Sequence, residues 1–136
     1  MSALQDKIDL SLRRLEKASD CLNDSRNLIR SGGYKSSANR SYYAVFHAIR
    51  AVLAFDDFDS KKHSGVISEF RKLYIKTGVF GDEISKIIGR QFDLRSLSDY
   101  DDFFDISKEN AENAFLEAEF VLSEIKKYLA VIFSAE

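Results

Sequence analysis

The sequence predicts an all-α fold, a compact bundle of about five helices that forms a single domain over residues 1–136. Apolar residues recur at intervals of three and four along most of the chain, and no useful length alternates with a period of two. The chain has no proline and only 6 glycines, too few turn-forming residues for a β-sandwich or barrel. Because 45% of its 136 residues are apolar, it can fill one core, which excludes disorder as the main description.

Two helices are predicted in the first 60 residues. The first runs from Ala3 to Ile29, and Ser31-Gly32-Gly33 ends it because glycine readily adopts the left-handed cap conformation. The second starts near Ser36 or Ser37 and runs to about residue 55, where an acidic stretch breaks it. This second helix is apolar on nearly every side, so we expect it to be buried on most of its surface.

Three further helices complete the predicted bundle. The third covers roughly residues 64–75, and a glycine-containing loop follows it. Asp82 caps the fourth helix, which reaches about Leu97, and an acidic, aromatic connector follows over residues 99–105. The last helix starts at Ser107, with Asn110 three residues later, and its apolar stripe continues to residue 129, so the first and last helices are long.

Several functional classes are excluded by composition and motifs. A single cysteine, Cys21, rules out a disulfide framework and a cysteine-based zinc site. The longest charge-free stretch, residues 41–49, is about half of a membrane span, and the start of the chain has no secretion signal. The aspartates at positions 101, 102 and 105 fit no calcium loop, and no nucleotide-binding glycine loop occurs. We therefore expect a cytoplasmic protein with no cofactor, no metal and no membrane partner.

Charge is unevenly distributed along the chain. Residues 25–76 carry ten basic and four acidic groups, whereas residues 77–136 carry six basic and thirteen acidic groups. Between Asp24 and Asp56 there is no carboxylate, yet there are five cations. Such a surface suits a polyanionic ligand or a partner of opposite polarity. The alternative is that the blocks intermix in the folded chain and their charges cancel.

Four segments of the sequence resemble a known family. The stretch from Gly33 to Ala48, GYKSSANRSYYAVFHA, looks like the signature helix of small prokaryotic HEPN-domain proteins (higher eukaryote and prokaryote nucleotide-binding domain). Lys62-His63-Ser64-Gly65-Val66, residues 70–78 ending in Lys-Thr-Gly, and Arg95 with Ser98-Asp99-Tyr100 fit the same compact branch. The order and spacing match over about residues 20–129.

The resemblance implies a fold, partners and an activity. It implies a HEPN-like bundle of about five helices that usually pairs into a homodimer, and RNA or nucleotide binding in a toxin–antitoxin or defence system. A small nucleotidyltransferase-type protein would be the antitoxin. Several HEPN branches are metal-independent endoribonucleases marked by an arginine, four to six residues, then a histidine. Arg40 and His47 enclose six residues here, so the resemblance assigns them as catalytic residues whose products would carry 2′,3′-cyclic phosphate and 5′-hydroxyl ends.

The spacing of Arg40 and His47 suits this chemistry. Seven residues are nearly two helical turns, so both side chains emerge on one face, roughly 10.5 Å apart along the axis. Each could reach a different oxygen around one phosphodiester. A histidine can act as base or acid on the 2′- and 5′-oxygens, and a guanidinium can hold the charge that develops on phosphorus.

Structural roles remain open for the same two residues. Arg40 lies close to a buried aromatic run and needs a partner, which is either substrate phosphate or Asp99 in an ion pair. His47, on an otherwise apolar helix, is either a catalyst or a hydrogen-bonded core residue. The rival hypothesis is therefore a catalytically inactive module that binds a second copy of itself or a nucleotidyltransferase-type partner.

The remaining candidate residues have similar alternatives. Of Tyr42 and Tyr43, one belongs to the core and the other could stack on a base or bind a phosphate. Lys62 and His63 lie in a basic turn that could hold a phosphate. The favoured alternative is that His63 and Ser64 cap the next helix. Arg95 and Asp99, four residues apart and next to Tyr100, could form a structural ion pair.

Overall fold

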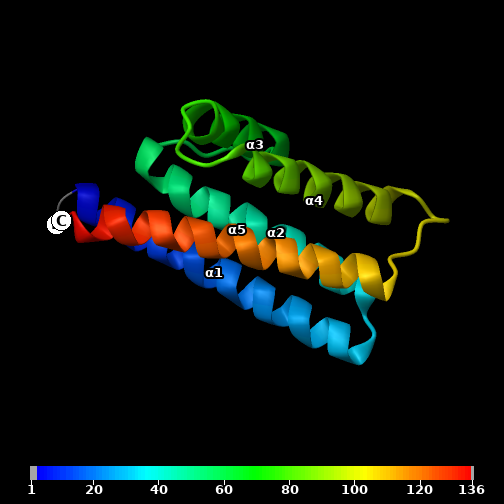
Figure 1. Cartoon of the computed structure of the whole chain (residues 1–136). Helices are drawn as coiled ribbons and strands as arrows, with labels where there is room; N and C mark the ends of the chain where they lie inside the picture. The colour runs from blue at the N-terminus through cyan, green and yellow to red at the C-terminus, as the bar shows by residue number, and fades with distance from the viewer. Residues whose placement is uncertain (1–2, 136) are drawn as a thin grey trace.

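The structure is a computed structural model that describes residues 3–135, and within these residues it contains five α-helices and no strand (Figure 1). The α-helices are α1 (Ala3–Ser31), α2 (Tyr34–Leu53), α3 (His63–Phe70), α4 (Asp82–Tyr100) and α5 (Lys108–Ser134). A short 3₁₀ turn, η1 (Ala54–Asp56), follows α2, and a π-helical turn, η2 (Arg71–Ile75), continues α3. The predicted all-α bundle with long first and last helices is confirmed.

Helix α2 lies at the centre of the bundle. It packs against α1, α4 and α5, and α3 crosses near its C-terminal end (Figure 1). Twelve of its 20 residues are buried, which confirms the expectation of a buried second helix. Because its neighbours cover it on several sides, a polar side chain on α2 reaches solvent only where two neighbouring helices diverge.

Helices α1 and α2 form an antiparallel pair joined by a two-glycine turn. Gly32 has a φ of 85°, the left-handed conformation in which glycine has no Cβ to clash. The Gly33 carbonyl already accepts the Ser37 N–H at 2.8 Å. For this reason α2 starts at Tyr34, earlier than the predicted Ser36 or Ser37.

The ends of α4 also differ from the prediction. Gly81, in an extended conformation, is the N-cap, and Asp82 is the first helical residue with no capping hydrogen bond from a side chain. Asp82 as the cap is therefore wrong, although its negative charge still favours the first turn. The helix continues to Tyr100, beyond the predicted Leu97 and into the predicted connector, because the Arg95–Asp99 ion pair supports its last turn.

The connector between α4 and α5 extends beyond the end of the bundle (Figure 1). It ends in a capping box, in which Ser107 accepts the Asn110 N–H at 3.0 Å and the Asn110 side chain accepts the Ser107 N–H at 3.3 Å. The predicted start of the last helix at Ser107 is thus confirmed.

Candidate functional site

Arg40 and His47 lie on α2 on either side of the Tyr43 ring. The Arg40 guanidinium carbon is 4.9 Å from the centre of that ring, and the His47 ring centre is 6.0 Å from it. All three side chains are half-buried. The three residues therefore form one continuous face, here called the α2 face, in which an aromatic ring separates a cation from an imidazole.

Arg40 is held by neighbours on its own helix and on α1. Its Nε and Nη2 donate to Asn39 Oδ1 at 3.3 and 2.8 Å, and its Nη1 donates to Cys21 Sγ at 3.8 Å. No ion pair joins Arg40 to Asp99 among the described residues, although both line one shallow pocket. The guanidinium thus has no carboxylate partner in this part of the chain and keeps its net charge available.

His47 has an unused ring nitrogen. Its Nδ1 is buried and has no hydrogen-bond partner among the described residues. Burial, followed by the nearby charges of Arg50, Lys17, Arg40 and His63, lowers the pKa of His47 to about 4. The imidazole is therefore neutral at pH 7, and a neutral imidazole has a lone pair that can accept a proton.

Tyr42 and Tyr43 play different parts, as expected. Tyr42 is buried in the core, and its hydroxyl forms a 2.8 Å hydrogen bond with His63 Nδ1. Tyr43 is half-buried, and its hydroxyl accepts a 3.4 Å hydrogen bond from Arg95 Nη2. Tyr43 therefore links Arg40 and His47 to α4.

His63 is not a helix cap. The N-cap of α3 is Lys62, which makes no side-chain capping bond, and His63 is the first helical residue. Its ring stacks on Phe46 with centres 4.0 Å apart while it bonds to Tyr42. The capping role favoured from sequence is wrong because the turn is closed instead by Ser60 Oγ, which accepts the Lys62 N–H at 3.1 Å. The Lys62 side chain is exposed.

Arg95 and Asp99 form the predicted pair. Arg95 Nε lies 3.3 Å from Asp99 Oδ2, and the Arg95 guanidinium lies over the rings of Tyr42 and Tyr43 at 5.1 and 5.6 Å. Arg95 thus brings α4 to the α2 face. Tyr100, by contrast, is 83% exposed at the end of α4 and takes no part in this cluster.

The sequence of the chain matches a known protein family. The family described as "HEPN domain" matches residues 11–128, which is most of the chain. The chain belongs to the HEPN domain family. The matched region contains every residue of the α2 face.

Curated relatives of this HEPN protein are small prokaryotic proteins. It is 36% identical over 115 residues to "Putative toxin MJ0142" of Methanocaldococcus jannaschii, covering 85% of this chain and 78% of that one. It is 33% identical over 113 residues to a "UPF0332 protein" of Thermotoga maritima, covering 83% and 86%. A third relative, "Putative toxin MJ0605" of M. jannaschii, is 32% identical over 118 residues, covering 87% of each chain.

Sequence reasoning missed three residues around the site of this HEPN protein. Arg50 and Lys17 both lower the pKa of His47, and Phe46 provides the surface on which His63 stacks. Arg50 also pairs with Asp59 at 3.1 Å. Arg50 was detectable, because it follows His47 by three residues and so lies near the same helix face. Lys17 comes from α1, and no local pattern places it there.

A pocket adjoins these residues. It has a volume of ≈ 430 Å³ and is lined by Phe46, Arg50, Asp59, Ser60, Lys61 and His63. Cations, an aromatic ring and an imidazole around an open space are groups that bind phosphates and stack on bases. No helix in the described residues is long and apolar enough to cross a membrane, and these residues contain no group of three or more potential metal-binding side chains.

Proposed function

We propose that this HEPN protein is a toxin-type protein that binds RNA or nucleotides at the α2 face and cleaves RNA there with Arg40 and His47. The observation that carries the proposal is a neutral, half-buried His47 imidazole on the same helix face as a guanidinium that lacks a carboxylate partner in the described chain. The names of the two relatives described as putative toxins support the biological setting.

In the proposed reaction His47 moves one proton and Arg40 balances charge. His47 takes the proton of the ribose 2′-hydroxyl, and the 2′-oxygen forms a bond to the adjacent phosphorus. The bond from phosphorus to the 5′-oxygen breaks, and the imidazolium returns the proton to that oxygen. Arg40 stabilises the extra negative charge on the phosphoryl oxygens. The products are a 2′,3′-cyclic phosphate and a 5′-hydroxyl end.

Phosphate binding would also raise the proton affinity of His47. Three of the groups that lower its pKa are the cations Arg50, Lys17 and Arg40, whose charges a bound phosphate would neutralise. The pKa of the imidazole would then move up towards neutrality, where a histidine serves best as base and acid. Tyr43, between the two catalytic candidates, offers a ring for a neighbouring base, and Lys62 and His63 would hold an adjacent phosphate.

The test is RNA cleavage by purified protein in EDTA, with 2′,3′-cyclic phosphate ends as the readout. His47→Ala should lower the rate by about 100-fold or more, and Arg40→Ala by a similar factor. The matched control is Arg30→Ala, which removes the same charge from an exposed position on α1. If His47→Ala and Arg40→Ala both cleave as fast as the parent, the assigned site is wrong.

A catalytically inactive binding module is the second candidate function. The observations that favour it are the ion pair of Arg95 with Asp99 and the hydrogen bond of Arg40 to Asn39, because both arginines then have partners within the chain and could be structural. In that case the chain would pair with a second copy or with a nucleotidyltransferase-type antitoxin, without cutting RNA. Absence of cleavage at any pH, together with a stable complex with such a nucleotidyltransferase, would support this candidate over the nuclease.

A further inference from the structure

Two arginines converge on one carboxylate where α1, α2 and the loop after η1 meet. Arg50 Nη2, from α2, lies 3.1 Å from Asp59 Oδ2, and Arg14 Nη2, from α1, lies 3.5 Å from the same oxygen. Arg14 is 7% exposed, and its Nη1 donates to the Arg50 carbonyl at 2.9 Å. We refer to Arg14 and Arg50 as the arginine pair. Because two guanidiniums share a single negative charge, the cluster keeps a net charge of +1.

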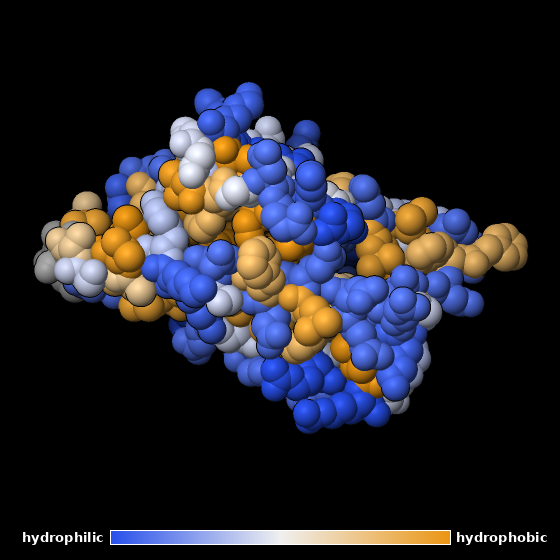
Figure 2. Space-filling model, viewed as in Figure 1, coloured by the Kyte–Doolittle hydropathy of each residue, from blue (hydrophilic) through white to orange (hydrophobic). Residues whose placement is uncertain are grey.

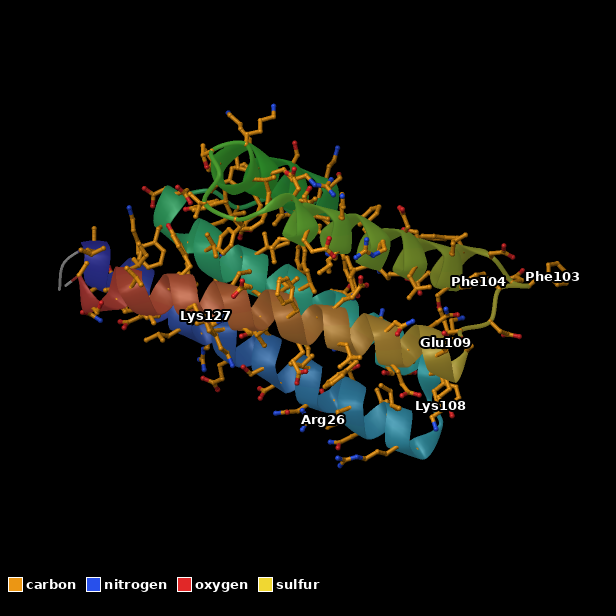
Figure 3. The ribbon with its side chains drawn as sticks, in the orientation of Figure 1. Arg26, Phe103, Phe104, Lys108, Glu109 and Lys127 are labelled. Atoms are coloured by element: carbon orange, nitrogen blue, oxygen red, sulfur yellow. The ribbon has the colours of Figure 1, made fainter. Side chains whose placement is uncertain are left out.

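The arginine pair differs from the ordinary surface ion pairs of this chain. Hydrophilic side chains cover much of the face shown in Figure 2, so charge by itself marks no site. On the outside of the bundle, Arg26 of α1 pairs with Glu119 and Lys127 of α5 pairs with Glu124, one cation to one carboxylate (Figure 3). Arg14, by contrast, is a buried cation that shares its carboxylate with a second arginine, and a buried charge without full compensation is costly.

Asp59 compensates the arginine pair incompletely. Burial and then the charge of Arg50 lower the pKa of Arg14, and Asp59 offsets only part of this effect. Asp59 offers one oxygen, Oδ2, to both guanidiniums, because its Oδ1 accepts the Ser60 N–H at 2.9 Å. A phosphate has an oxygen for each guanidinium, and hydrogen bonds from arginine to phosphate are among the strong ones in proteins. The arginine pair is therefore better suited to a phosphate than to the carboxylate it holds.

The Asp59 carboxylate can leave the arginine pair at little cost. Its side chain is 54% exposed, and it belongs to residues 57–62, which lie between η1 and α3 and form no helix. Exposed ion pairs contribute little to stability because water replaces the lost contact. Displacement of Asp59 therefore breaks no helical hydrogen bond and exposes no core residue.

The arginine pair adjoins the α2 face. Arg50 follows His47 by three residues, roughly 4.5 Å along the helix axis, and so lies near the same side of α2. After burial, the charge of Arg50 contributes most to the lowered pKa of His47. Arg50 lines the ≈ 430 Å³ pocket described above, Arg14 lines a neighbouring hollow of ≈ 490 Å³, and Asp59 is the one residue that lines both. Asp59 thus occupies the place where an anion would meet both arginines.

We propose that the arginine pair is a second phosphate-binding subsite, and that Asp59 fills it in the free protein as an internal substitute for phosphate. A backbone phosphate next to the one at His47 displaces the carboxylate and accepts hydrogen bonds from Arg14 and Arg50. This inference rests on the proposed function, because its ligand is part of the RNA bound at the α2 face. Asp59 then competes with RNA, so removal of its charge increases affinity.

The first experiment measures binding of inorganic pyrophosphate by calorimetry. Asp59→Asn should tighten binding by about 10-fold, because it removes the competing charge and keeps the size of the side chain. Asp57→Asn is the matched control: it makes the same charge change two residues away, at a carboxylate that pairs with Lys7 of α1 at 3.2 Å. The control should tighten binding by less than about threefold, which is the general effect of one charge. Equal gains for the two variants overturn the proposal.

Two further variants separate loss of charge from a loosened loop. Asp59→Glu keeps the carboxylate and should bind pyrophosphate within about threefold of the parent. Asp59→Asn combined with Arg50→Gln should lose the gain, because one of the two guanidiniums is then missing. Circular dichroism checks that each variant is folded. A gain for Asp59→Glu as large as that for Asp59→Asn contradicts the proposal.

The second experiment measures binding of fluorescent RNA whose 2′-hydroxyls are methylated, so that it cannot be cut. Asp59→Asn should bind this RNA about 10-fold more tightly than the parent, and a short polyglutamate peptide should gain no affinity. A gain for the peptide but not for RNA would assign the subsite to an acidic protein and overturn the proposal. If the parent cleaves RNA while Asp59→Asn and Asp57→Asn bind it alike, the subsite is wrong and the proposed function stands. A pyrophosphate gain with no RNA binding by any variant supports the phosphate subsite and contradicts the proposed function.

Discussion

At the scale of single residues, the surroundings of His47 decide its protonation. Burial and the nearby cations lower its pKa to about 4, whereas an exposed histidine titrates near 6.5. The folded chain therefore keeps this imidazole neutral at pH values where the unfolded chain protonates it. Between pH 6.5 and pH 4 the unfolded chain binds a proton at His47 and the folded chain does not. The free energy of unfolding therefore falls as the pH decreases through this range.

The lowered pKa of His47 predicts how the stability of the protein changes with pH. Between pH 7 and pH 4.5, the free energy of unfolding of the parent should fall by about 1–2 kcal/mol more than that of His47→Asn, after allowance for the partial exposure of the imidazole. Urea denaturation at the two pH values measures the difference. His63 needs its own control, His63→Asn, because burial, Arg95 and Arg50 lower its pKa as well. Equal pH slopes for the parent and His47→Asn would contradict the assignment.

Residue-level predictions succeeded where the relevant contacts are local. The shared helix face of Arg40 and His47 and the Arg95–Asp99 pair follow from intervals of seven and four, which the helix repeat converts directly into neighbours. The bond between Tyr42 and His63 joins residues 21 positions apart, and Lys17 approaches from another helix. Such contacts depend on tertiary packing, so the sequence pattern carried no signal for them. The catalytic roles themselves stay predictions.

At the scale of elements, the contact between α1 and α2 depends on small polar residues. Ser25 Oγ lies 2.9 Å from Ser37 Oγ and 2.7 Å from Ser41 Oγ, and Ser37 Oγ donates to the Ser25 carbonyl at 2.9 Å. All three serines are fully buried. Small side chains allow close approach of the two helices, and mutual hydrogen bonds satisfy the hydroxyls.

Disrupting this serine cluster should destabilise the bundle. Ser25→Val should lower the free energy of unfolding by about 2–3 kcal/mol, because it adds volume and leaves Ser41 with one partner fewer. Ser36→Ala, at an exposed position on α2, is the control and should change stability by less than about 0.5 kcal/mol. Chemical denaturation gives both values. A Ser25→Val variant as stable as Ser36→Ala would show that the cluster contributes little.

Element boundaries were harder to predict than the elements. Apolar periodicity located all five helices, and the Ser107–Asn110 pair located the start of α5 because its capping chemistry is local. The π-helical turn at residues 71–75 had no such signal, and α4 extended beyond its expected end through one ion pair. Helix ends depend on a few hydrogen bonds worth about 1 kcal/mol each, so a single weak contact can move them.

At the scale of the whole molecule, the cationic middle of the sequence is only partly neutralised. Asp59 pairs with Arg50 and lies 3.5 Å from Arg14, and Asp99 pairs with Arg95. Arg40, Lys61 and Lys62 have no carboxylate partner among the described ion pairs. Both interpretations of the charge pattern therefore hold in part. The described ion pairs also leave Arg30, Lys35, Arg71, Lys72 and Lys76 without a carboxylate, so the unpaired cations are spread from the end of α1 to η2.

RNA binding should depend on these unpaired cations. Lys61→Glu with Lys62→Glu should weaken RNA binding by about 10-fold or more at low salt and reduce its salt dependence, because fewer counterions are released. Lys126→Glu with Lys127→Glu makes the same charge change on α5 and should alter the dissociation constant by less than about threefold. Fluorescence anisotropy with labelled RNA at several salt concentrations measures both. Equal losses for the two pairs would indicate a diffuse electrostatic effect rather than a binding face.

Because of the π-helical turn, the chain should tolerate the deletion of one residue in η2 better than a deletion in α2. In this turn the Lys76 N–H reaches back five residues to the Arg71 carbonyl, at 2.9 Å, so η2 contains one residue more than an ordinary helical turn. Loss of one residue there would leave a regular helix, and α4 would keep its place. Loss of one residue between Arg40 and His47 would rotate one of them by about 100° around α2 and separate the guanidinium from the imidazole. During divergence of such chains, gaps should therefore accumulate after Phe70 and be absent from the middle of α2.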